Sequence, residues 1–176
     1  MAKNTFQQAM LIGIGLMVAI GFSGIFSYSN LANPGSTSNN QDNQEINATM
    51  PTQNFAQESY DLSVQEQAYL SVNNQVVFVN VLHRESNQNY TQLQNIPSQF
   101  NNQVYINPVN MSESSFATGT GAEAPSALII GDQPARTQRG TLPYSIRQAQ
   151  IIQESVVSGI CSAKRDVSNF GATCYS

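Results

Sequence analysis

The strongest constraint on this chain is an uncharged apolar segment near its N-terminus. Residues 9–28, AMLIGIGLMVAIGFSGIFSY, contain no charged side chain. A helix needs about 20 mostly apolar residues to cross a bilayer, so this segment predicts a single-pass membrane anchor. Lys3 precedes the segment, and no charge follows it until Asp42. This asymmetry of charge predicts that residues 1–8 form a short cytoplasmic N-terminus. The C-terminal domain is then extracytoplasmic, in a periplasm or at a cell surface.

A cleaved signal peptide is the alternative interpretation of the same segment. Signal peptides have an apolar core of ~7–15 residues followed by a cleavage site of small residues. The sequence SYS at 27–29 offers such a site, but the apolar run is longer than a signal-peptide core. We therefore expect an uncleaved anchor that contacts membrane lipid.

Composition excludes several classes of function. Charged residues make up 10% of the 176 residues, against ~25% in an average soluble protein. The formal net charge is -4 and lysine and arginine form no cluster, which argues against a nucleic-acid partner. His83 is the only histidine, and together with two cysteines it gives too few ligands for a structural zinc site. We expect neither a metal nor a cofactor.

A composition change separates the anchor from a folded domain. Residues 29–54 are rich in Asn, Gln, Ser and Pro and nearly lack large apolar side chains, which is typical of a flexible linker. The domain is expected over 55–160, with a C-terminal tail over 161–176.

Apolar patterns within the domain predict a mixed α/β fold. The sequence SVQE at 63–66 fits a capping box and predicts a helix to about residue 70. β-branched apolar runs predict buried strands. These strands are expected over 75–82, 103–109 and 126–130.

The remaining segments give weaker predictions. Residues 85–96 are a weak helix candidate, and 135–141 is expected to be the return strand of a hairpin. Over 143–160, apolar side chains recur every three or four residues, which predicts an amphipathic helix.

This order of elements resembles the thioredoxin-like fold over residues 60–160. In that family a cis-proline precedes the third core strand, and Pro125 in EAPSALIIGD takes that place. The sequence from 131 to 156 is similar to the family's closing hairpin and C-terminal helix, with Gly140 where a glycine often lies. The resemblance implies a mixed sheet with flanking helices.

The chain departs from the family where the redox motif belongs. A Cys-x-x-Cys motif should follow the first core strand, but the sequence there is HRESNQNY. Four polar residues hold this degenerate active-site position: His83, Arg84, Glu85 and Gln88. Because thiol–disulfide exchange needs a thiolate, the resemblance implies a redox-inactive domain. A His83–Glu85 acid–base pair is an alternative, but no nucleophile accompanies it, and a solvent-facing polar strand end is the favoured interpretation.

Five further residues carry candidate covalent features. Cys161 and Cys174 are expected to form a structural disulfide in an oxidising compartment, whereas their spacing gives no support to a redox-active pair. Three N-x-[ST] sequons are possible glycosylation sites: Asn47, Asn89 and Asn110.

Three hypotheses of function remain open. The leading one is a non-catalytic, membrane-anchored structural subunit that binds protein partners in an envelope or other membrane assembly. A pilin-like filament subunit is the second, although NPGSTSNN interrupts any helix just beyond the membrane segment. The third is an enzyme, either a relative of thiol oxidoreductases or a hydrolase.

Overall fold

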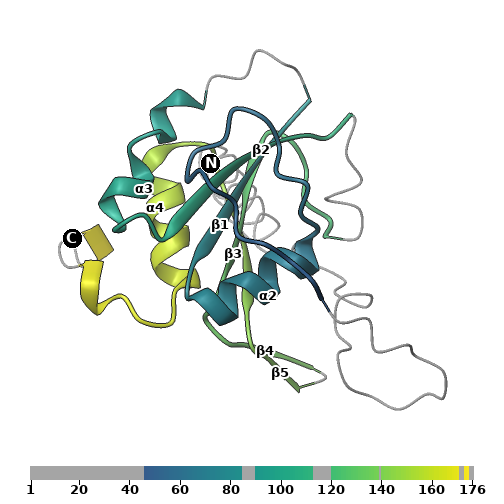
Figure 1. Cartoon of the computed structure of the whole chain (residues 1–176), viewed down its shortest axis with the longest axis vertical. Coiled ribbons are helices and arrows are strands. Elements are labelled where there is room, and N and C mark those ends of the chain that lie inside the picture. The colour runs from purple at the N-terminus through teal and green to yellow at the C-terminus, as the bar shows by residue number, and fades with distance from the viewer. Residues whose placement is uncertain (1–45, 85–89, 113–119, 139, 171–172, 175–176) are drawn as a thin grey trace, which may run out of the picture.

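The computed structural model describes residues 46–84, 90–112, 120–138, 140–170 and 173–174, which form a mixed α/β domain (Figure 1). The elements follow in this order: α2 (Val64–Asn74), β1 (Val77–His83), η2 (Thr91–Leu93), α3 (Ile96–Gln99), β2 (Val104–Asn110), β3 (Ser126–Gly131), β4 (Ala135–Thr137), β5 (Gly140–Leu142), β6 (Ser145–Ala149), α4 (Gln153–Ala163) and η3 (Ser168–Phe170).

The main sheet has four strands in the order β2-β1-β3-β6. β1 pairs with β2 in parallel and with β3 antiparallel, and β3 pairs antiparallel with β6. β4 and β5 form a separate two-stranded hairpin that projects beyond the sheet in Figure 1. The sheet is therefore mixed.

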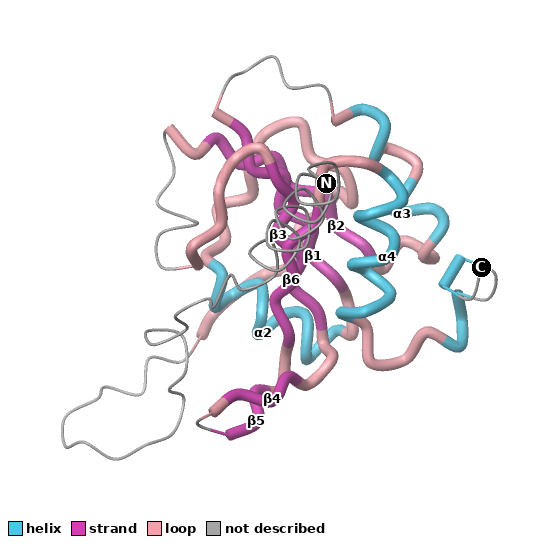
Figure 2. Tube along the Cα trace, turned by 180° about the vertical axis from the view of Figure 1, so that it is seen from behind, coloured by secondary structure: helices cyan, strands magenta, loops and turns pink. Residues whose placement is uncertain are grey.

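Helices cover both faces of the sheet, with α2 on one side and α3 and α4 on the other (Figure 2). Alternate residues of a strand point to opposite faces. Val79 of β1 accordingly packs with Val156 and Ile160 of α4, whereas Phe78 packs with the α2 side. Burying one such side chain fully contributes about 1.5–3 kcal/mol, so these two clusters hold the layers together.

The predicted capping box at the start of α2 is confirmed. The Ser63 hydroxyl accepts a hydrogen bond from the Glu66 backbone N–H at 3.2 Å, and the Ser63 N–H donates to the Glu66 carboxylate at 2.7 Å. The helix ends where Gln75 adopts a left-handed conformation with φ 54°. The Ser63 hydroxyl and then its backbone N–H hold the pKa of the Glu66 carboxyl below its usual value.

Strands predicted over 75–82, 103–109 and 126–130 are confirmed as β1, β2 and β3. The weak helix candidate at 85–96 is partly outside the described residues. Its described part contains the short 3-10 helix η2 and the start of α3 at Ile96.

The prediction for residues 135–160 was wrong in two respects. Residues 135–141 do not return along the sheet, because β4 pairs with β5 instead. The helix expected over 143–160 is confined to α4, because the preceding residues form β6. Ile146 and Ala149, which suggested a helical stripe, lie opposite Ile130 and Ala127 of β3. Pairing with a buried strand thus prevails over a spacing of three that suits a helix equally well.

The predicted N-terminal regions lie largely outside the described residues. These are residues 1–8, the anchor at 9–28 and most of the linker. Among the residues that the structure describes, no helix combines the length and apolarity needed to span a bilayer. The end of the expected linker, 46–54, belongs to the domain, because Ala48 and Met50 pack against the cluster beneath α2.

Candidate functional site

The end of β1 carries the residues that sequence analysis singled out. His83 is the last residue of β1, and Arg84 beyond it is exposed. β3 begins with Ser126 opposite Leu82, which places the exposed Pro125 beside the end of β1. The Ala124–Pro125 peptide bond is cis. Glu85 and Gln88 lie outside the described residues.

Tyr90 connects this strand end to the N-terminal segment of the domain. Its ring stacks on His83 at a centroid distance of 6.4 Å and contacts Phe55 at 5.7 Å. Its hydroxyl donates a hydrogen bond to the Gln57 carbonyl oxygen at 3.3 Å. Burial raises the pKa of the Tyr90 phenol, so the group is a neutral hydrogen-bond donor and not a base at ordinary pH.

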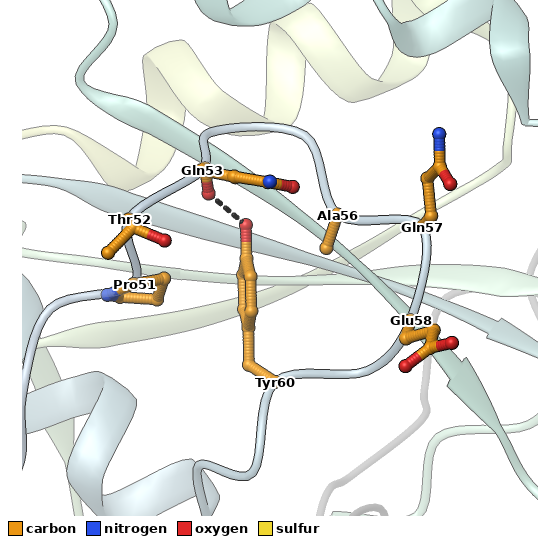
Figure 3. Close-up of a pocket in the computed structure, with 7 residues that line it drawn as sticks. All are labelled: Pro51, Thr52, Gln53, Ala56, Gln57, Glu58 and Tyr60. Carbon is orange, nitrogen blue, oxygen red and sulfur yellow. Dashed lines mark hydrogen bonds between the residues drawn. The ribbon is translucent and has the colours of Figure 1, made fainter.

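A polar hollow lies within the N-terminal segment (Figure 3). Its volume is about 490 Å³, and its lining residues are Pro51, Thr52, Gln53, Ala56, Gln57, Glu58 and Tyr60. The Tyr60 ring points toward Gln53, and its hydroxyl donates to the Gln53 carbonyl oxygen. Burial, and secondarily the Tyr105 phenol, raises the pKa of Tyr60 far above its ordinary value. Glu58 supplies the one carboxylate in the lining, so the hollow is polar and carries one acidic side chain.

Residues 54–56, the closing segment, fasten this region to the outer edge of β2. The Ile106 N–H donates to the Asn54 carbonyl oxygen at 2.7 Å, and the Ala56 N–H donates to the Ile106 carbonyl oxygen at 3.0 Å. The Asn54 side-chain amide also donates to the carbonyl oxygens of Asn102, at 2.7 Å, and Val104, at 3.1 Å. The segment that lines the hollow is therefore held to the edge of the sheet by hydrogen bonds.

Three fully buried amide side chains support the same region from inside. Asn80 and Gln67 exchange hydrogen bonds of 2.8 and 3.1 Å, and the Asn107 amide donates to Asn80 Oδ1 at 2.7 Å. The Tyr60 N–H donates to Asn107 Oδ1 at 2.7 Å. We call Gln67, Asn80 and Asn107 the amide ladder. It joins α2, β1, β2 and the segment around Tyr60.

The amide ladder was not predicted from the sequence. Its signal was an asparagine at the fourth position of each of two otherwise apolar strands, VFVNVLH and VYINPVN. Residues in register on parallel strands point to the same face, so equivalent positions in the two strands place Asn80 and Asn107 side by side.

The two cysteines lie away from Pro125. Cys161 and Cys174 form a disulfide near the end of α4. The following turn of α4 approaches the far end of β3 so closely that a Cβ on Gly131 would meet the Ala163 carbonyl oxygen. Since Pro125 stands at the opposite end of β3, the disulfide and the end of β1 are separated by the length of that strand.

Two of the three predicted glycosylation sites lie among the described residues. Asn47 is exposed. Asn110 is half-buried, and its side-chain oxygen accepts from the Ser112 N–H at 3.0 Å. Asn89 lies outside the described residues. Within the described ranges, no group of three His, Cys, Asp or Glu side chains is arranged to hold a metal ion.

The described residues thus combine a polar strand end, two phenols and a polar hollow on a mixed α/β scaffold. No protein-family model matches the sequence, and comparisons with curated proteins and with solved structures find no match. The assignment of function therefore rests on the residues themselves.

Proposed function

We propose that this chain is a non-catalytic, membrane-anchored interaction subunit whose ectodomain is a thioredoxin-like domain without a redox centre. The strand order β2-β1-β3-β6 supports the fold assignment, as does the place of Pro125 between the end of β1 and the start of β3. The sequence of residues 9–28 supports a transmembrane helix, with the N-terminus cytoplasmic and the domain extracytoplasmic.

One observation carries the non-catalytic assignment. The chain has two cysteines, and they are bonded to each other near the end of α4, far along β3 from Pro125. Thiol–disulfide exchange at the end of β1 requires a thiolate at that place. His83 and Arg84 stand there instead. A scaffold of this kind retains surfaces for partner binding.

Gentle detergent extraction of the full chain from its native membrane, followed by mass spectrometry of what comigrates, tests the binding role. We expect companions in stoichiometric amounts. A lone monomer in mild detergent would contradict the proposal.

An insulin-reduction assay on the same preparation tests the absence of catalysis. We expect turnover no greater than that of a variant with both cysteines replaced by serine. Turnover above that control would identify an oxidoreductase and overturn the assignment.

A further inference from the structure

The outer edge of β2 is blocked by three features. The backbone N–H and C=O of Ile106 are both hydrogen-bonded to the closing segment, and the Asn54 side-chain amide donates to the Val104 carbonyl oxygen. Residues two apart in a strand present their backbone groups to the same side, so Pro108 faces outward as well. Proline has no N–H to offer an added strand. This edge is therefore closed to strand addition.

The opposite edge, formed by β6, has no such cover in the part of the chain that the structure describes. The sheet ends at β6, and the one isolated bridge among the described residues lies on β2. An edge strand leaves a row of N–H and C=O groups directed out of the sheet. Ser145–Ala149 contains no proline, so this row can pair with an extended chain.

The side chains of β6 indicate what kind of chain would pair. Arg147 is at the centre of the strand and exposed. Among the described residues the one ion pair joins Lys164 to Asp132, so the Arg147 guanidinium has no carboxylate partner there. Opposite charges on directly facing residues of neighbouring strands stabilise the pair, and like charges destabilise it. Pairing of two copies of β6 centred on Arg147 would place two guanidinium groups together.

We propose that β6 is the docking strand for an extended segment of a partner protein that carries a carboxylate opposite Arg147. The inference deepens the proposed binding function and rests on it. Backbone hydrogen bonds to the outer row of β6 supply the affinity, as in other complexes formed by strand addition. The pairing of Arg147 with the carboxylate selects the register, because a slip by one residue would turn the carboxylate to the other face.

Hydrogen exchange of the full-length chain in detergent tests this inference with designed peptides. The probe is a capped peptide of about nine residues, close to strand length, with alternating threonine and valine and one central glutamate. The matched control has lysine in place of the glutamate, and a second control has proline at alternate positions. We expect the glutamate peptide to slow amide exchange in β6 and to bind about tenfold more tightly than the lysine peptide. The proline peptide should give no protection.

The variant Arg147→Glu sharpens the test, because Arg147 is exposed and its replacement leaves the core intact. The order of affinities should reverse, with the lysine peptide now the tighter one. Absence of protection in β6, or equal binding of the glutamate and lysine peptides, would overturn the inference. Protection of β6 that depends on protein concentration without any peptide would identify a second copy as the occupant and overturn it too.

The docking inference and the proposed function fail in different ways. If the peptides do not bind but companions still co-purify with both wild type and Arg147→Glu, the docking strand is wrong and the binding function stands. If the chain turns over insulin, the binding function is wrong whatever the peptides do.

Discussion

The two edges of the main sheet differ in whether their outward backbone groups are covered. At β2, the closing segment and Pro108 occupy or remove the outward backbone groups. At β6, five residues with an exposed central arginine end the described sheet. Natural sheets usually protect both edges against unwanted pairing. A short strand with a charged centre discourages pairing with most chains but leaves the backbone groups of β6 uncovered, so a chain of complementary charge could still make contact there.

The closed edge is also the more deeply supported one. The amide ladder beneath it contains side chains with no exposed surface, and buried polar groups are stable only when each finds a partner. Asn107 links this ladder to Tyr60 and so to the segment that covers β2. Changes to the ladder should therefore affect the closed edge first.

The largest effect is expected from Asn107→Ala. The substitution leaves the part-buried Tyr60 N–H without its partner and removes one of the two hydrogen bonds that Asn80 Oδ1 accepts, the other coming from Gln67. The free energy of unfolding should fall by about 2–4 kcal/mol. Urea denaturation followed by circular dichroism measures this change. The matched control is Gln148→Ala on the open edge, where an exposed amide is lost and the change should stay within about 0.5 kcal/mol. Equal losses in the two variants would remove the contrast between the edges.

A smaller effect is expected from Asn54→Ala, which removes two side-chain hydrogen bonds from the closing segment. We expect a loss of about 1 kcal/mol, since partly exposed groups regain water as a partner. Exchange of the Ile106 amide hydrogen should become about fivefold faster, as the segment opens more often. The control Asn74→Ala, which loses one bond to the Leu70 carbonyl oxygen in α2, should leave exchange at Ile106 unchanged.

Ser63→Ala tests the helix that carries Gln67 over the ladder. Loss of the N-cap hydroxyl should cost about 1 kcal/mol. The pKa of Glu66 is held low by the Ser63 hydroxyl and backbone N–H, so the variant should bring this pKa closer to its ordinary value. A carboxyl with a depressed folded-state pKa contributes stability above its unfolded-state pKa and loses it as the pH falls through the folded-state pKa.

The variant should accordingly lose less stability on acidification than the wild type. NMR titration of Glu66 and urea denaturation at several acidic pH values measure the two effects. The exposed Ser59, whose hydroxyl bonds the Tyr60 carbonyl oxygen, provides the control Ser59→Ala. An unchanged Glu66 titration in Ser63→Ala would contradict the assigned cause.

The smallest effect on stability is expected from Pro108→Val. The substitution restores an outward N–H on β2 while nearly preserving volume, so stability should change by less than about 1 kcal/mol. The consequence should instead appear as stronger self-association in sedimentation velocity, because a protected edge gains a donor. If self-association does not change, Pro108 is not among the features that close this edge.

Much of the fold could be predicted from local patterns. The apolar strands β1, β2 and β3 stood out because they are buried on both faces, and the N-cap of α2 stood out because Ser63 and Glu66 are three residues apart. β6 was missed because Ile146 and Ala149 satisfy a helical spacing, and only the neighbouring β3 decides between helix and strand.

Less of the site could be predicted. The place of Pro125 beside the end of β1 followed from the order of elements. The role of residues 46–56 did not, because single contacts such as those of Met50 and Asn54 decide whether a polar segment is ordered. Asn80 and Asn107 were hidden for a related reason, since asparagine in a sequence suggests exposure and here both side chains are fully buried.

The closing segment also determines how many strands the domain can recruit. A sheet with two available edges can grow at both and so propagate into a fibre. With β2 covered, the main sheet has one edge available for strand pairing and ends any larger sheet that it joins. Each copy would therefore hold one extended segment at β6, and an assembly built through this contact would contain discrete pairs.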